Sequence, residues 1–453
     1  MSEPKIERQK LTWRHVAVVV TMCLTIGTAV GIVFLAAGLC YRPVAEHFGV
    51  QVSDVSLYVT CVYLGGAVGP VPAGWLFDRF NPKIVFGTAA LLVIVPYLGF
   101  AFYPAIWCFW VAGFIIGLGL CALQYTMTAG ILSRWFHTNY GTVIGITFAM
   151  TGLGGICWNL IGQHVLGPDL SGWPQLYLIL GCFIAVGTLP GILLFVRRTP
   201  EEVGLLPYGM PLNAEEAHIE QGNNKVEEPG YTFRETIRMP LFYIMLLGCG
   251  LMNIVTIICQ LFATYIQFLG HDGWYGVPLL ALLLLSGTLE AFTSGGQMIG
   301  KVIVGWVESR HLLGAQIMGV CGGVVGVLLM WQSPKLLGEA GIMPMFMGGA
   351  FYGLMYACST AMIPFLIREV FGGRDYNRIY SVQVMVYNAV GAFGATAWAV
   401  IAQTWGWDAF FIASLAVIVV TFLLFAYTGQ AGYRKRAKTW YKSDEQLAAE
   451  GGK

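Results

Sequence analysis

Two charged side chains lie well inside an otherwise apolar stretch of the sequence. Glu290 and Lys301 are eleven residues apart within residues 279–306. On a helix, eleven residues turn through about 1100°, so the two groups share one face, about 16 Å apart along the axis. Ser294 and Gln297 lie on the same side. A carboxyl group can take up a proton, and an ammonium group attracts an anion. The spacing therefore indicates a polar face suited to anion binding and proton uptake.

The composition shows how exceptional these two groups are. The 453 residues are 57% hydrophobic and 11% charged, whereas a soluble domain carries about 25% charged residues. A charge at the centre of a membrane helix costs about 2.5 to 3.5 kcal/mol, so each group needs a partner, water or a role. With 25 basic against 24 acidic residues, no charge excess favours nucleic acid as a partner. The chain is expected to lie in the lipid bilayer.

Twelve apolar runs, each long enough to span a bilayer, are expected to position the polar face. Backbone groups in hydrocarbon must be satisfied within their own segment, so these runs are predicted to be helices. The polar, acidic stretch 197–240 divides them into two groups of six. The predicted spans are about 16–40, 56–77, 84–102, 105–132, 141–165, 175–196, 241–269, 279–306, 313–332, 343–367, 380–404 and 408–428.

The basic residues predict an orientation. With both termini placed in the cytoplasm, all but three of the 25 Lys and Arg residues fall on the cytoplasmic side; Arg42 and Lys335 fall outside, and Lys301 lies within a span. This asymmetry follows the positive-inside rule. The sequence predicts a multi-pass protein of the cell membrane. Its parts are a cytoplasmic N-terminus at 1–15, six-helix halves at 16–196 and 241–428, a cytoplasmic central loop at 197–240 and a cytoplasmic tail at 429–453.

A short loop motif recurs at equivalent places in the two halves. Residues 74–83 read Gly-Trp-Leu-Phe-Asp-Arg-Phe-Asn-Pro-Lys, and residues 305–310 read Gly-Trp-Val-Glu-Ser-Arg. Such internal symmetry is typical of a transporter with two related halves. The first copy resembles the loop motif of the major facilitator superfamily. The resemblance implies an all-α membrane fold of twelve transmembrane helices in two six-helix, pseudo-symmetric halves. It also implies gating roles for Asp78, Arg79, Arg134 and Arg310.

A narrower resemblance concerns the substrate. The Arg-Trp-Phe sequence at 134–136 is similar to the start of the fifth helix in monocarboxylate porters and oxalate/formate antiporters. In that group an arginine four residues before the second loop glycine binds the substrate carboxylate, and the resemblance places Lys301 there. A lysine that couples protons in the first helix of animal monocarboxylate porters corresponds to Leu35. No second cation lies between residues 379 and 403, which favours a monoanion over a dianion.

Both charged residues also have simpler explanations. Lys301 is about five residues from the predicted cytoplasmic boundary and could extend its ammonium group to the cytoplasm or pair with Glu308. Glu290 could be protonated and hydrogen-bonded to a neighbouring helix, with no part in transport.

Other polar residues within the spans could line a cavity between the halves, or could make helix-packing hydrogen bonds. The eleven cysteines fall in apolar stretches with no CxxC pair and no neighbouring His at ligand spacing. They are interpreted as packing residues, and no metal or cofactor is predicted. Besides Lys301 and Gln297, the residues predicted to bind substrate are Gln124, Tyr125, Asn253, Tyr356, Tyr387 and Asn388.

These features together favour a secondary active transporter of small organic anions of the monocarboxylate type. It would work by alternating access as a proton symporter and would function as a monomer. Lys301 would bind the anion, and Glu290 would take up the proton. Anion exchange, efflux of amphipathic compounds and a transport-dead membrane sensor are the alternatives. The sequence shows no nucleophile–base constellation and no phosphate-binding glycine loop after a strand, so no enzyme activity is predicted.

Overall fold

A computed structural model describes residues 8–167, 169–212, 230–271, 279–308, 311–372 and 374–439. Within these ranges the regular structure is helical, and pairing of extended segments is limited to three isolated bridges near the central loop. The predicted all-α fold is confirmed.

The helices of the first half begin and end where the local sequence requires. α3 (Tyr41–Phe48) is followed by Gly49, whose φ of 63° is a left-handed conformation that glycine adopts without steric cost. α6 (Pro82–Gly99) begins at Pro82, and the side chain of Asn81 accepts a hydrogen bond from the Lys83 amide. The elements are α1 (Trp13–Thr25), η1 (Ile26–Val30), α2 (Gly31–Leu35), η2 (Ala37–Cys40), α3 (Tyr41–Phe48), α4 (Val52–Val68), α5 (Pro70–Arg79), α6 (Pro82–Gly99), α7 (Ile106–Leu123), α8 (Tyr125–Trp135), α9 (Tyr140–Leu166) and α10 (Trp173–Phe195).

The second half repeats this organisation after the central loop. Its last two spans lie in α18 (Tyr376–Gly391) and α19 (Gly394–Thr439), which are separated by a short turn at residues 392–393, and α19 is broken at Gly406, whose φ is 83°. The central loop contains η3 (Pro200–Val203) and α12 (Phe233–Thr236). The elements of the second half are α13 (Pro240–Ile257), η4 (Ile258–Leu261), α14 (Phe262–His271), α15 (Leu279–Glu308), α16 (Leu312–Leu337), η6 (Gly338–Gly341), α17 (Ile342–Phe371), α18 (Tyr376–Gly391) and α19 (Gly394–Thr439).

The helices correspond to the predicted spans. Among the described residues, nine helical stretches are long and apolar enough to cross a membrane. One of them, Arg378–Gly432, contains the last two predicted spans on either side of Gly406. The second span is formed by the shorter apolar helix Val52–Val68 with α5, and the eighth span is α15. Each of the twelve predicted spans therefore has a helical counterpart.

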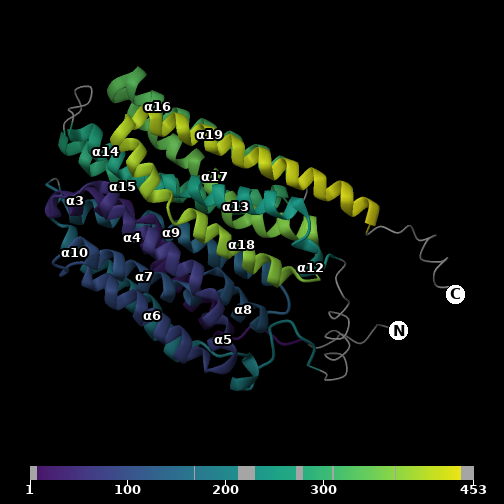
Figure 1. Cartoon of the computed structure of the whole chain (residues 1–453). Coiled ribbons are helices and arrows are strands. Elements are labelled where there is room, and N and C mark those ends of the chain that lie inside the picture. Colours follow the sequence, from purple (N-terminus) through teal and green to yellow (C-terminus); the bar gives the residue numbers. More distant parts are fainter. Residues whose placement is uncertain are drawn as a thin grey trace.

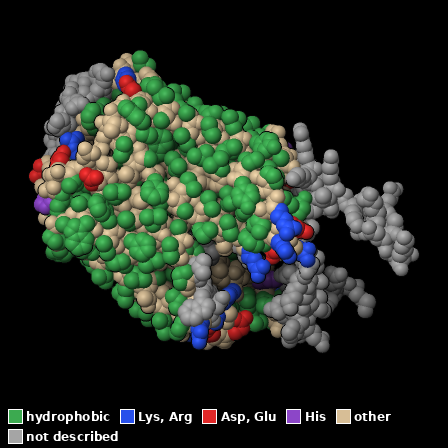
Figure 2. Space-filling model, viewed as in Figure 1, with side chains coloured by type: hydrophobic (Ala, Val, Ile, Leu, Met, Phe, Trp, Pro, Cys, Tyr) green, Lys and Arg blue, Asp and Glu red, His purple; other side chains and the backbone are tan. Residues whose placement is uncertain are grey.

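The two halves lie side by side along the length of the bundle (Figure 1). The first half, purple to blue, meets the second, teal through green to yellow, where α9 packs against α15, where α4 packs against α18 and α19, and where α3 and η2 meet η4 and α14. Within the second half, α15 also packs against α17. In the visible face of the space-filling view, hydrophobic side chains cover the flank, whereas charged side chains gather at the two ends (Figure 2). This distribution fits a bundle surrounded by lipid.

The first span contains a π-helical turn, η1, between α1 and α2. The carbonyl of Gly27 in this turn accepts a hydrogen bond from Trp158 Nε1 on α9 at 2.7 Å. A Cβ atom at Gly154 would overlap the backbone of Gly27, so α9 and the turn touch backbone to backbone. Small residues allow helices in a membrane to approach this closely. The turn therefore fixes how the first span presents its later residues.

Candidate functional site

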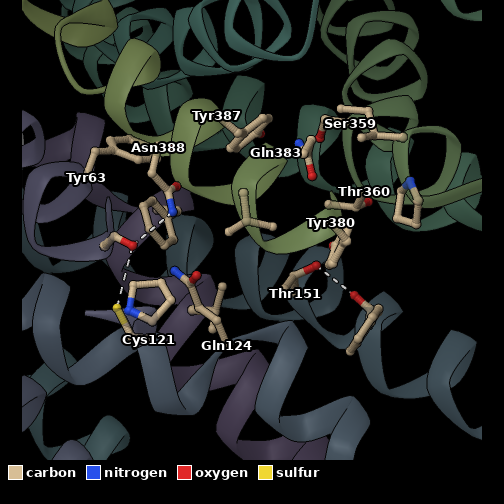
Figure 3. Close-up of a pocket in the computed structure, with 18 of the residues that line it drawn as sticks. Tyr63, Cys121, Gln124, Thr151, Ser359, Thr360, Tyr380, Gln383, Tyr387 and Asn388 are labelled. Carbon is tan, nitrogen blue, oxygen red and sulfur yellow. Dashed lines mark hydrogen bonds between the residues drawn. The ribbon is translucent and has the colours of Figure 1, made fainter. Parts of the chain in front are cut away.

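A cavity of about 330 Å³ lies between the two halves. The first half contributes residues of the first span, α4, α5, α7 and α9, and the second half contributes α15, α17 and α18 (Figure 3). The volume is at the lower end of the range for small-molecule sites. The lining residues are Val30, Phe34, Leu35, Tyr63, Gly66, Pro70, Cys121, Gln124, Phe148, Thr151, Gln297, Tyr356, Ser359, Thr360, Ile363, Pro364, Tyr380, Ser381, Gln383, Val384, Tyr387 and Asn388.

The lining combines aromatic rings with amides and hydroxyls, and none of these residues carries a charged side chain. Four amide side chains line it: Gln124, Gln297, Gln383 and Asn388. Asn388 Nδ2 donates to the Gly66 carbonyl across the two halves at 3.1 Å (Figure 3). The oxygen atoms Oε1 of Gln297 and of Gln383 are buried and have no hydrogen-bond partner. A buried acceptor without a partner is costly, so these two oxygens are available to a ligand.

Lys301 lies directly behind the cavity wall. Its ammonium group donates to the Phe148 carbonyl at 3.0 Å and to the Thr151 hydroxyl, both on α9. Phe148 and Thr151 line the cavity, and Lys301 itself does not. Gln297, one helical turn earlier on α15, does line it. The structure thus places the lysine at the contact between the halves, within one side chain of the cavity. The side chain of Glu308, its alternative partner, lies outside the described residues.

Glu290 occupies a different environment from Lys301. Its side chain is 2% exposed, and its Oε1 has no hydrogen-bond partner. Tyr41, Cys259 and Tyr352 are close enough to interact with its charge. Neither Glu290 nor Ser294 lines the cavity. Of the four residues on this polar face of α15, Gln297 alone lines the cavity, and α15 packs against α9 and α17.

The remaining predicted substrate residues fall into three groups. Gln124, Tyr356, Tyr387 and Asn388 line the cavity, as Gln297 does. Asn253 is fully buried instead, and its Nδ2 donates to the Tyr387 carbonyl at 2.7 Å, so it holds α13 against α18. The side chain of Tyr125 lies outside the described residues.

Several lining residues were not predicted from the sequence: Thr151, Gln383, Tyr380 and Tyr63. A signal for two of them was present, because Tyr380, Gln383 and Tyr387 recur at intervals of three and four residues, which places them on one helical face. No comparable signal singles out Thr151 or Tyr63.

Two of the residues predicted to gate the transporter, Arg79 and Arg134, lie at the end of the bundle that carries α5, α8 and α12 (Figure 1). Arg79 and Arg134 have exposed side chains there. The side chain of Asp78 and the whole of Arg310 lie outside the described residues.

The halves are joined at the opposite end of the bundle, near α3 and α14 (Figure 1). Tyr41 donates to Gln260 Oε1 at 2.6 Å, and Gln260 Nε2 donates to the Phe34 carbonyl at 3.3 Å. Arg42 donates to the Gln267 carbonyl. A Cβ atom at Gly38 would overlap the backbone of Gln260. We call this set of contacts the α3/α14 seam; it closes the bundle on one side of the cavity.

Comparisons with known proteins agree with this architecture. The sequence model of the Major Facilitator Superfamily matches residues 17–363. The chain belongs to the major facilitator superfamily. It is a multi-pass membrane protein, and its superfamily and relatives indicate a transporter.

Similar proteins include the oxalate:formate antiporter of Oxalobacter formigenes, 23% identical over 408 residues that cover 85% of this chain and 84% of the relative. The niacin transporter NiaP of Acinetobacter baylyi is 30% identical over 151 residues, which cover 33% of this chain and 32% of that protein. Among solved structures, nucleoside transporter NupG matches with a TM-score of 0.65 and 11% identity, covering 93% of this chain and 99% of its own.

A bacterial homologue of the human lysosomal transporter Spinster, in an inward-facing and unoccupied conformation, matches with a TM-score of 0.59 and 16% identity. The match covers 95% of this chain and 97% of that one. The structural matches show the shared fold of this major facilitator transporter.

Proposed function

We propose that this transporter moves small organic monoanions of the monocarboxylate type by secondary active transport. The proposal places it in the cell membrane as a monomer with both termini in the cytoplasm. Proton symport is preferred to anion exchange.

The observation that carries the proposal is the position of Lys301. Its ammonium group hydrogen-bonds Thr151, whose side chain lines the cavity between the halves. A lysine in a partly desolvated site attracts a carboxylate strongly. Small rotations of Lys301 and Thr151 would bring the ammonium group to an anion in the cavity. Because the described lining residues carry no charge, one cation at the wall suits a single negative charge.

The α3/α14 seam supports an alternating-access cycle. On α4, Thr60 bonds Thr396 across the halves, whereas Tyr63 and Gly66, further along the same helix, line the cavity. The cavity therefore lies on the side of the seam toward α5. We propose that this conformation faces the cytoplasm and that separation at the seam produces the outward-facing state.

Glu290 is proposed to take up the coupling proton. It is a carboxyl group buried in the second half, close to residues of the seam, so its charge state can influence whether the seam opens. Intramembrane acids of this kind commonly serve proton relays.

Anion exchange is the second candidate, and a specific observation favours it. The oxalate:formate antiporter of Oxalobacter formigenes is similar over 85% of this chain. The two candidates differ in a measurable way: a symporter accumulates anion when only a pH gradient is imposed, whereas an exchanger requires anion on both sides.

The test is uptake of formate, lactate and benzoate into liposomes that contain the purified protein. Lys301→Gln is expected to lower uptake at least tenfold, while Lys335→Gln, at the exposed lysine that pairs with Asp408, leaves it unchanged. Unchanged uptake by folded Lys301→Gln protein would reject the role of the lysine. Transport and thermal stabilisation by amines alone would reject the anion substrate.

A further inference from the structure

We propose that the substrate is a single-ring aromatic monocarboxylate that carries a hydroxyl or amino group on the ring. The ring would lie between the tyrosines of the cavity, the ring donor would bond the free oxygen of Gln383, and the carboxylate would face Thr151 and Lys301. This inference rests on the proposed function and makes its substrate class specific.

The aromatic lining comes from both halves. Phe34 on α2 and Tyr63 on α4 form one side, with ring centroids 5.2 Å apart. Tyr356 on α17 and Tyr380 and Tyr387 on α18 come from the second half. Aromatic rings attract one another beyond the effect of buried area. An acid of one or two carbons would leave most of the cavity of about 330 Å³ unfilled, whereas a substituted ring can contact both halves at once.

Gln383 supplies a hydrogen-bond acceptor, which would favour an aromatic acid with a donor group on its ring over one with an unsubstituted ring. The residue is 3% exposed, lines the cavity, and its Oε1 has no hydrogen-bond partner. The thiol of Cys249, which is buried on α13, lies beside this amide. The side chain points into the cavity from the α18 wall, across from Thr151 (Figure 3).

Gln297 on α15 provides a second acceptor, on another wall of the cavity. It is 2% exposed on α15, it lines the cavity, and its Oε1 also lacks a partner. An ionised carboxylate only accepts hydrogen bonds, so it cannot satisfy either glutamine oxygen. A ring hydroxyl or amino group donates and can do so. The lining thus offers two acceptors for donors on the ring, and Lys301 behind Thr151 offers the cation for the carboxylate.

The described lining residues carry no charge, and this limits the number of charges that the substrate can carry. A second carboxylate on the ring would enter a cavity that presents it with amides, hydroxyls and aromatic faces. Burying an uncompensated charge is costly. The site therefore suits one carboxylate and neutral substituents.

The experiment compares four acids by isothermal titration to the full-length purified protein: 4-hydroxybenzoate, benzoate, cyclohexanecarboxylate and formate. We expect 4-hydroxybenzoate to bind about five- to tenfold more tightly than benzoate, because it adds one buried hydrogen bond. Benzoate should bind more tightly than cyclohexanecarboxylate, and formate should bind most weakly.

Two variants test whether Gln383 is responsible for the preference for 4-hydroxybenzoate over benzoate. Gln383→Leu should remove the preference for 4-hydroxybenzoate over benzoate and retain benzoate binding. Gln403→Leu, at a glutamine that does not line this cavity, should keep the preference. If Gln383→Leu does not fold, the order of the four acids on the unaltered protein still decides the proposal.

Equal binding of benzoate and 4-hydroxybenzoate, or tightest binding of formate, would overturn this inference and leave the monoanion transporter standing. Failure of all four acids, together with binding of amines, would reject both proposals.

Discussion

Lys301 on α15 donates a hydrogen bond to the hydroxyl of Thr151 on α9, and Thr151 in turn donates to the Phe148 carbonyl at 2.8 Å. The lysine therefore bridges the two halves at the wall of the cavity. An anion that drew the ammonium group into the cavity would weaken this bridge, so binding and the contact between the halves are linked through one side chain.

The bridge predicts a stability effect at Thr151. Thr151→Val removes the hydroxyl that accepts from Lys301, and a hydrogen bond to a charged group contributes about 1.5 to 3 kcal/mol. We expect a lower midpoint of thermal unfolding in detergent. Thr151→Ser keeps the hydroxyl and should stay close to the unaltered protein. Equal midpoints for the two variants would show that the bridge adds no stability.

A side chain at position 38 is expected to prevent the α3/α14 seam from closing. A Cβ atom there would overlap the Gln260 backbone across the α3/α14 seam, so Gly38→Ala should hold the seam open and reduce liposome transport at least tenfold in folded protein. Gly141→Ala is the matched control, because nothing lies within 4 Å of its added Cβ. Normal transport by Gly38→Ala would mean that the seam does not need to close.

The hydrogen bond from Tyr41 to Gln260 stabilises the closed form of the α3/α14 seam. Its loss should shift the equilibrium toward the open seam, by less than Gly38→Ala does. Tyr41→Phe removes one buried bond of 2.6 Å, worth about 0.5 to 1.5 kcal/mol, or about 2- to 12-fold in the population of the open seam. Hydrogen exchange measured by mass spectrometry should become faster in peptides covering α3 and α14. Peptides that cover α12, at the opposite end of the bundle (Figure 1), should not change. Unaltered exchange at α3 and α14 would contradict this role of the bond.

Glu290 predicts how transport depends on pH. If it carries the coupling proton, Glu290→Gln should abolish accumulation driven by an inward proton gradient and preserve exchange of labelled for unlabelled anion. Glu202→Gln is the control, since that glutamate is exposed in η3, away from the seam and the cavity. Accumulation that survives in Glu290→Gln protein would assign the proton to another group.

The fold was predictable because the bilayer imposes one length and one backbone solution on every span. The twelve runs and the central division followed from that constraint alone. Within α18, the intervals between Tyr380, Gln383 and Tyr387 contained enough information to place them together, as helical geometry shows.

The extent of the cavity could not be derived in the same way. Glu290 and Lys301 share a helical face, yet whether that face meets a cavity depends on which helices cover it. α15 packs against α9 and α17, and only tertiary packing decides this. Asn253 shows the same limit, because its amide is used by the Tyr387 carbonyl rather than by the cavity.

The π-helical turn at Ile26–Val30 affects how this chain is aligned with others. A π-helical turn holds one more residue than the α-helical turn it replaces. A relative whose first span is regular therefore needs a one-residue gap within this turn. Without the gap, every later position of the span is matched one residue off, on a face about 100° away. The correspondence at Leu35, which lines the cavity, changes with the placement of that gap.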